Sequence, residues 1–237
     1  MIQPMLRALV FALLLAAPAA FAQSAAVPKF SRLDSMEARA QGCTTCHGQQ
    51  GQGTANAEFP RIAGKPAGYL FNQLKAFRDG TRRYPAMNYL VAFLTDDYLR
   101  EMAEYFAALR PPFDPPVTNG ASAAAMQLGR SLVAAGDPNR QVPACMACHG
   151  PNLTGMEPGI PGLVGLKPNY IAAQLTRWRT GDRQALAPDC MQRIASRLRD
   201  EDITAVSAWL GSLAAPQDAS PEIRNLQRMP MACGSQR

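Results

Sequence analysis

The sequence predicts an all-α protein built from two tandem domains of the same fold, and three observations support this. A Cys-x-x-Cys-His motif occurs twice, at residues 43–47 and 145–149. The segments that follow the two motifs match each other at a nearly constant offset, which indicates a duplicated domain. In both copies the apolar residues recur at helical spacing, whereas strand-like alternation is scarce.

Each Cys-x-x-Cys-His motif is typical of covalent c-type haem attachment, in which two thioethers hold one porphyrin and the histidine binds the iron. A redox-active cysteine pair and half of a zinc site are the alternatives. Neither explains why both motifs end in the only two histidines among 237 residues. We therefore expect two covalently bound c-type haems. The predicted thioether sites are Cys43, Cys46, Cys145 and Cys148, and the predicted proximal ligands are His47 and His149.

Residues 1–22 have the features of a secretory signal peptide. Arg7 precedes a short apolar run, and the small residues that follow end in an Ala-x-Ala site, so cleavage is expected after Ala22. The apolar run falls short of the ~18 to 20 residues that a membrane-spanning helix needs. The mature chain is therefore expected to be exported, to the periplasm of a Gram-negative source, without a transmembrane span. Peripheral membrane association is left open.

The charge of the chain does not indicate a nucleic-acid partner. The formal net charge of +6 includes Arg7, and the mature polypeptide carries +5. Up to four haem propionates would cancel most of this excess. No basic run with interleaved aromatic residues is present, so we expect no binding to nucleic acid. A basic face that docks an acidic protein remains open.

The internal repeat gives the expected domain boundaries. Residues 59–64 match residues 160–165 at an offset of 101, and from Met87 and Met191 onward the offset is 104. The proline-rich segment between the copies favours an extended connector. We expect an N-terminal domain at 23–110, a linker at 111–120, a C-terminal domain at 121–214 and a C-terminal extension at 215–237.

Helices are expected at equivalent places in the two copies. An Ala-rich segment at 31–41 precedes the first motif, and residues 122–135 are its counterpart. The segment 66–79 begins with a proline suited to a first turn and stops before a glycine. Thr95 then caps a helix that runs to Leu109, with acidic residues in its first turn. Because about 90 residues form a thin core, a haem would supply much of the apolar volume of each domain.

Methionine is the expected sixth iron ligand, because both histidines are used on the proximal side. Met87 lies 40 residues after His47, and Met191 lies 42 residues after His149. Each also stands seven residues before a matching leucine. The remaining methionines of the mature chain are expected in the core, beside the motifs or in the extension, namely Met36, Met102, Met126, Met146, Met156, Met229 and Met231. A His/Met pair raises the reduction potential and leaves no open iron position, which favours electron transfer.

Tyrosine and arginine residues near the predicted ligand loops have no settled role. Tyr69, Tyr170, Arg82, Arg83 and Arg183 lie near these loops in the sequence. They either contact the haem propionates or are exposed loop residues, and the sequence favours neither interpretation.

On these motifs the chain resembles the dihaem cytochrome c family typified by cytochrome c4. The resemblance covers nearly the whole mature sequence, as two class I cytochrome c-like domains with one motif and one ligand methionine each. It implies the thioether sites and iron ligands given above and a periplasmic electron carrier rather than an enzyme. The partners it implies are redox proteins such as a terminal oxidase, a cytochrome reductase or a dehydrogenase.

Cys190 and Cys233 are the only cysteines outside the motifs. In an oxidising compartment the favoured interpretation is a disulfide that ties the C-terminal tail to the second ligand loop. A Cys190 thiolate that binds the second iron is the alternative, and the protein would then resemble dihaem sulfur-compound dehydrogenases of the thiosulfate dehydrogenase kind. Unpaired surface thiols are a third possibility. A further alternative makes the chain the dedicated cytochrome subunit of a periplasmic dehydrogenase.

Overall fold

The structure is a computed structural model that describes residues 32, 34–56, 58–117, 120–223 and 229–236. The chain divides into two units, Met1–Arg32 and Leu33–Arg237, and all elements named below lie in the second unit. The signal peptide expected at 1–22 lies outside the described residues. The expected all-α class is confirmed, because the strands of the described part are limited to one antiparallel pair, β1 (Gly155–Met156) and β2 (Ile160–Pro161).

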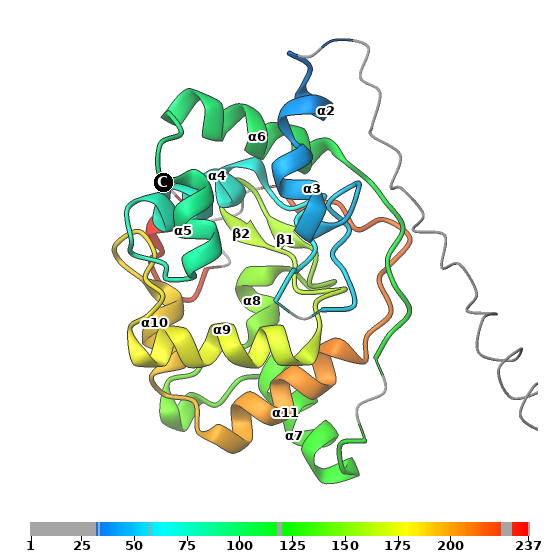
Figure 1. The fold of residues 1–237 in the computed structure, drawn as a ribbon. Helices are drawn as coiled ribbons and strands as arrows, with labels where there is room; N and C mark the ends of the chain where they lie inside the picture. Colours follow the sequence, from blue (N-terminus) through cyan, green and yellow to red (C-terminus); the bar gives the residue numbers. More distant parts are fainter. Residues whose placement is uncertain (1–31, 33, 57, 118–119, 224–228, 237) are drawn as a thin grey trace, which may run out of the picture. The chain divides into compact units, whose positions relative to one another are not determined.

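The described residues of the first domain form five helices (Figure 1). They are α2 (Met36–Arg39), α3 (Gln41–His47), α4 (Ala67–Arg78), α5 (Pro85–Val91) and α6 (Asp96–Ala108). The helix expected at 31–41 is shorter and is interrupted. Ser35 starts α2 because its hydroxyl accepts a hydrogen bond from the Ala38 amide at 3.2 Å, and Ala40 separates α2 from α3. Thr95 caps α6 as expected.

The second domain repeats this order. Its helices are α7 (Ala123–Ala134), α8 (Cys145–His149), α9 (Pro168–Thr180), α10 (Cys190–Ala195) and α11 (Asp200–Gly211), with the short 3₁₀ helices η1 (Pro138–Arg140) and, in the extension, η3 (Gly234–Gln236). The helix expected at 122–135 is confirmed, with Ser122 and Ala135 as its caps. Helix α11 packs against both α7 and α9 (Figure 1).

Each domain has its own apolar core. In the first domain α4 packs against α6, and the buried side chains separate into one cluster around Leu70 and Phe106 and another around Phe77 and Leu99. In the second domain the buried residues of α7, α9 and α11 form a single cluster that includes Leu132. No helix among the described residues is both long and apolar enough to cross a lipid bilayer.

The linker is held against the first domain by Arg61. The Arg61 guanidinium donates hydrogen bonds to the carbonyls of Pro111 at 2.6 Å and Pro112 at 2.9 Å. It also lies 3.8 Å from the centre of the Phe113 ring. A buried guanidinium with these partners fixes the path of residues 111–113 at the point where the chain leaves the first domain.

Candidate haem-binding sites

Each Cys-x-x-Cys-His motif lies on a helix that ends at the histidine. Helix α3 ends at His47 and α8 ends at His149, and the next residue, Gly48 or Gly150, has a φ of 83° or 84°. Such positive φ values favour glycine, because other residues would be strained there. The glycine therefore turns the chain away directly after the histidine, and both imidazoles occupy equivalent positions.

Both histidines are oriented by a backbone carbonyl of the same domain. His47 Nδ1 lies 2.8 Å from the Pro60 oxygen, and His149 Nδ1 lies 2.7 Å from the Pro161 oxygen. The ring donates from Nδ1 in this geometry, so Nε2 keeps its lone pair for a metal ion. Burial lowers the pKa of both imidazoles, and it lowers the pKa of His149 to about 4. Both rings are therefore neutral near pH 7, as iron ligation requires.

The motif cysteines lie in largely apolar surroundings. None of the four is in a disulfide. Burial raises the pKa of Cys43 to about 11 and that of Cys145 to about 12. These thiols are protonated near neutral pH, whereas redox-active cysteine pairs depend on an accessible thiolate. Within the part of the chain that the structure describes, no three His, Cys, Asp or Glu side chains are grouped as a metal cluster would need.

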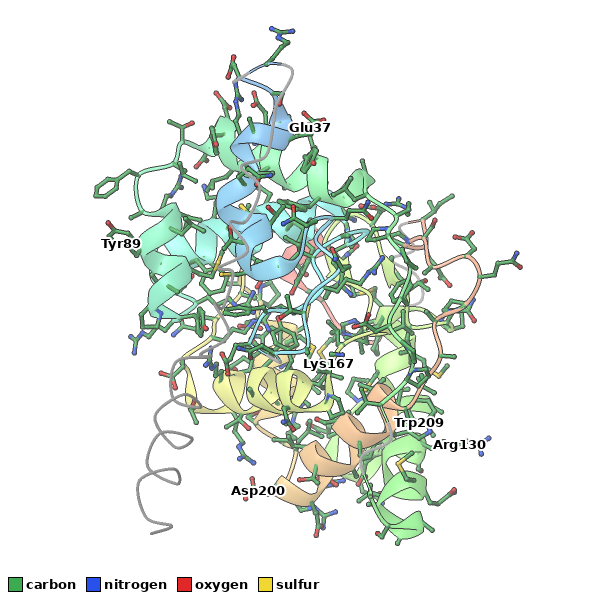
Figure 2. The ribbon with its side chains drawn as sticks, turned by 45° about the vertical axis from the view of Figure 1, so that its right-hand side comes forward. Glu37, Tyr89, Arg130, Lys167, Asp200 and Trp209 are labelled. Carbon is green, nitrogen blue, oxygen red and sulfur yellow. A yellow bond between two sulfur atoms is a disulfide. The ribbon has the colours of Figure 1, made fainter. Side chains whose placement is uncertain are left out.

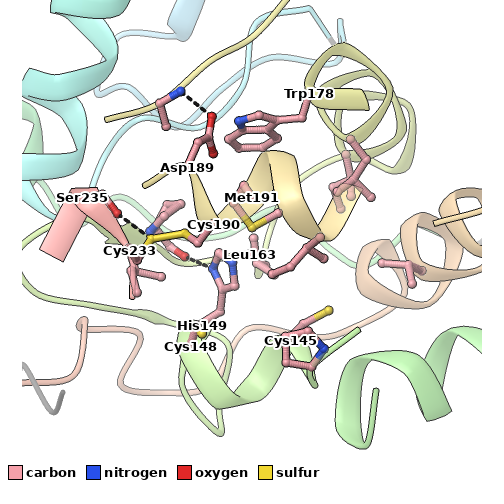
Figure 3. Close-up of a pocket in the computed structure, with 18 of the residues that line it drawn as sticks. Cys145, Cys148, His149, Leu163, Trp178, Asp189, Cys190, Met191, Cys233 and Ser235 are labelled. Atoms are coloured by element: carbon pink, nitrogen blue, oxygen red, sulfur yellow. Dashed lines mark hydrogen bonds between the residues drawn. A yellow bond between two sulfur atoms is a disulfide. The ribbon is translucent and has the colours of Figure 1, made fainter. Parts of the chain in front are cut away.

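A cavity in the second domain brings the predicted haem residues together (Figure 3). Cys145, Cys148, His149 and Met191 all line it. The remaining lining is mostly apolar and comes from α9, α11 and neighbouring segments, with Leu132, Ile171, Leu175, Trp178, Val206 and Leu210 among its members. Two thiols, one imidazole and one thioether on an apolar cavity fit a covalently attached porphyrin. The individual ligand assignments remain predictions.

Side chains of the first domain also line this cavity of the second domain. Tyr69 and Gln73, both on α4, are among its lining residues. At the repeat offset of 101 their counterparts are Tyr170 and Gln174, and nothing in the sequence places Tyr69 and Gln73 at the cavity of the other domain. The second predicted haem site is therefore completed by side chains from the first domain.

In the first domain a predicted thioether site and the predicted distal ligand lie on neighbouring clusters. Cys43 packs against the cluster around Leu70, and Met87 on α5 packs against the cluster around Phe77. Phe71 belongs to the surroundings of both clusters. The Met87 side chain is half-buried, so its thioether remains a predicted ligand at the edge of the core.

Three of the competing methionines pack as expected for core residues. Met102 and Met156 are 4% and 1% exposed, and Met36 packs against the cluster around Leu70. Met156 packs with Cys148 and Ile160 on the β1–β2 side of the second motif, in a cluster that Met229 covers.

Cys190 and Cys233 form a disulfide, which overturns the Cys190-ligand alternative. The two Cα atoms are 5.1 Å apart, and both sulfurs are used in the bond. A disulfide sulfur carries no thiolate charge, so Cys190 cannot bind the second iron as a thiolate in this state. The bond connects the C-terminal extension to the start of α10, directly beside Met191 (Figure 3). Asp189 caps this helix by accepting from the Gln192 amide at 3.0 Å.

The two domains meet through a symmetric network of arginine, glutamine and tyrosine. Arg82 donates to Gln73 of its own domain and to Gln174 and Tyr170 of the other. The repeat mate Arg183 donates in the same way to Gln174, Gln73 and Tyr69. Arg82 and Arg183 are 7% and 3% exposed, so the exposed-loop interpretation is wrong for both.

Arg83 differs from the two buried arginines. Its side chain is 72% exposed, and it pairs with Asp182 at 3.7 Å. The exposed-loop interpretation therefore holds for Arg83. An exposed pair of this kind contributes little to stability.

Lys65 is a further contact across the interface that the sequence analysis did not single out. Its ammonium group donates to the Gly162 carbonyl of the second domain at 2.6 Å. Burial lowers the pKa of Lys65 to about 7. The sequence offered one indication of a special role for Lys65, because its counterpart at the repeat offset of 101 is the apolar residue Leu166.

Comparisons with known proteins agree with this arrangement. The cytochrome c family model matches residues 37–109 and 127–214. A thiosulfate dehydrogenase electron acceptor from Thiomonas intermedia is 37% identical over 77% of this chain and 81% of its own. Cytochrome c4 from Pseudomonas aeruginosa is 34% identical over 75% of this chain and 86% of its own.

Two solved structures have the same fold. The crystal structure of cytochrome c4 from Pseudomonas stutzeri has a TM-score of 0.67 and 28% identity, covering 77% of this chain and 99% of that one. The thiosulfate dehydrogenase (TsdBA) from Marichromatium purpuratum has a TM-score of 0.66 and 34% identity, covering 73% of this chain but 36% of that longer chain.

Proposed function

Because the chain belongs to the cytochrome c family and has two covalently bound c-type haems, we propose that it is a periplasmic carrier of single electrons whose donor is a thiosulfate dehydrogenase. Electron transfer by a dihaem cytochrome follows from the family. The donor is the finer part of the proposal. It is supported by the name of the Thiomonas relative and by the Marichromatium structure, in which a region similar to this chain belongs to a thiosulfate dehydrogenase.

One observation carries the proposed role as a carrier. His149 and Met191, the proposed axial ligands of the second iron, line the same cavity, and the disulfide removes Cys190 as a competing ligand. By the repeat, His47 and Met87 take the equivalent roles in the first domain. Iron with both axial positions filled has no place for a substrate, and a thioether ligand favours the ferrous state.

The residues of the chain prepare each site for electron transfer. The Pro60 and Pro161 carbonyls hold the imidazoles in one orientation, which raises their basicity as ligands. The mostly apolar lining of the cavity in the second domain surrounds the proposed iron site with few polar groups. The bound haem supplies the reversible one-electron chemistry of iron.

The test combines spectroscopy with a partner assay. We expect the oxidised mature protein to show methionine-ligated signals from both irons, and the reduced protein to bind no carbon monoxide. Thiosulfate with the thiosulfate dehydrogenase of Thiomonas intermedia should reduce both haems, whereas thiosulfate alone should not. Carbon monoxide binding by the wild type would contradict the closed sites. Failure of the enzyme to reduce the protein would contradict the proposed donor and leave a general electron carrier.

A further inference from the structure

Helix α5 and the residues directly after it present an apolar face to solvent. Tyr89 is 83% exposed, Leu90 is 41% exposed and Phe93 is 93% exposed. Figure 2 shows Tyr89 on the outer side of α5. We call these three residues the aromatic face. Two aromatic rings left in water within one helical turn are costly, and such a patch indicates an interaction site.

The aromatic face lies beside the proposed first haem. Met87, the proposed distal ligand, is on the same helix, and Val91 on the opposite side of α5 is 2% exposed. Leu90 also reaches the haem-attachment helix, because a Cβ placed on Gly42 would lie 3.9 Å from Leu90 Cδ1. Gly42 is the residue before Cys43. A protein docked on this face would therefore approach the first haem between its attachment helix and its ligand helix.

The fold does not require aromatic residues at these positions. At the repeat offset of 104, the counterparts of Tyr89 and Phe93 in the second domain are Arg193 and Arg197. Arg193 is exposed, and Arg197 donates to Gln141 at 2.9 Å. The second domain thus has Arg193 on α10 where α5 has Tyr89, and Arg197 after α10 where Phe93 follows α5. The two domains present different chemistry beside their proposed methionine ligands.

We propose that the aromatic face docks the thiosulfate dehydrogenase that reduces this protein, and that electrons enter at the first domain. This inference rests on the proposed donor. Apolar contacts suit a partner that stays in contact, whereas charged faces steer short diffusive encounters. In the Marichromatium thiosulfate dehydrogenase structure, the region similar to this protein makes up 36% of a longer chain, and association within one chain is the lasting contact that an apolar face fits. Arg193 on α10 and Arg197 just after it suit a second, transient acidic acceptor.

The experiment measures the reduction rate of the oxidised holoprotein by thiosulfate and the Thiomonas intermedia dehydrogenase. The variant is Tyr89→Ser combined with Phe93→Ser, and because both side chains are exposed the fold is preserved. Loss of two anchor residues should lower the second-order rate at least about tenfold, at low and at high salt. Ile223→Ser is the matched control, since Ile223 is 89% exposed but lies in the extension, and it should leave the rate unchanged. Reduction by dithionite should be equal in all three proteins.

Three results would overturn the docking assignment while the proposed donor stands. The first is a wild-type rate retained by the double variant. The second is a wild-type protein that sediments as a dimer, together with a double variant that sediments as a monomer but is reduced at the wild-type rate. A second copy of the chain would then occupy the aromatic face. A third result, an Arg193→Ser variant that alone slows reduction by the dehydrogenase, would place electron entry at the second domain. If the dehydrogenase does not reduce the wild type, the proposed donor itself fails.

Discussion

Arg82 and Arg183 face each other across the domain interface, where their backbones form an antiparallel bridge. Each guanidinium donates to the glutamine of the other domain, Arg82 to Gln174 at 2.9 Å and Arg183 to Gln73 at 2.8 Å. All their side-chain partners in this network are neutral amide or phenol groups. Burial lowers the pKa of the Arg183 guanidinium to about 10, because it disfavours the charged form. Two buried cations whose partners are neutral therefore favour an anion nearby. Haem propionates in contact with these arginines, one of the two interpretations that the sequence left open, would supply that negative charge.

The first prediction concerns this network. Arg82→Ala should lower the free energy of unfolding by about 2 to 3 kcal/mol, because Gln174 and Tyr170 lose a buried hydrogen-bond donor. Arg82→Lys should restore only part of the loss, since an ammonium group lacks the forked geometry. Denaturant titration of the holoprotein measures both. Arg83→Ala is the control, and its effect should stay below about 0.5 kcal/mol. Equal effects at the two positions would contradict a structural role for the network.

The second prediction concerns the proposed distal ligands. Met87→Ala and Met191→Ala should each open one iron, so that each reduced variant binds one equivalent of carbon monoxide and the potential of one haem falls. Carbon monoxide titration and a potentiometric titration measure this. Met156→Leu is the matched control because Met156 is a buried core residue of similar volume. The ligand assignment fails if either alanine variant remains closed to carbon monoxide.

The third prediction concerns the disulfide beside Met191. Replacing both Cys190 and Cys233 with serine should destabilise the protein by about 3 to 4 kcal/mol, given the 43-residue separation that the bond closes. The loss should fall mainly on the second domain, because the bond holds the start of α10. In the double serine variant, cyanide should then displace the methionine ligand of one haem faster than the methionine ligand of the other haem. Mild reduction of the wild type should reproduce the effect, and identical cyanide kinetics in the two proteins would argue against it.

The fourth prediction concerns pH and Asp202 in α11. The Asp202 carboxylate is fully buried, which alone would raise its pKa, but hydrogen bonds from Arg140 and Arg199 lower the pKa to about 2. The Asp202 carboxyl therefore binds a proton more tightly in the unfolded chain than in the folded protein. Its ionised form stabilises the fold above pH ~4, and this stabilisation is lost as the pH falls towards 2.

Asp202→Asn should accordingly lower the free energy of unfolding by about 2 kcal/mol at pH 7. The difference from the wild type should shrink steadily between pH ~4 and ~2. Denaturant titrations at pH 7, 4 and 2.5 would follow it. Glu201→Gln, a neighbour whose side chain is 60% exposed, should show no such pH dependence. A constant difference for Asp202→Asn across this range would contradict the lowered pKa.

The structure shows where local sequence patterns were sufficient and where they were not. Thr95 marked the start of α6, and the expected segment 122–135 begins at the cap Ser122, because capping acts within one helical turn. The interrupted helix at 31–41 was missed because Ser35 lies inside a periodic Ala-rich segment and only its hydrogen bond to Ala38 reveals the cap. The roles of Arg82 and Arg183 stayed open because burial depends on the partner domain.

The sequence by itself determined the number of covalently bound haems, the duplication and the all-α class, since each depends on spacing along the chain. Only the tertiary structure decided that Cys190 pairs with Cys233, that Tyr69 and Gln73 border the cavity of the other domain, and that α5 leaves an aromatic face in solvent. The physical reason is that these features arise from packing between segments distant in sequence. Helical periodicity records which side of an element is apolar, but not which element covers it.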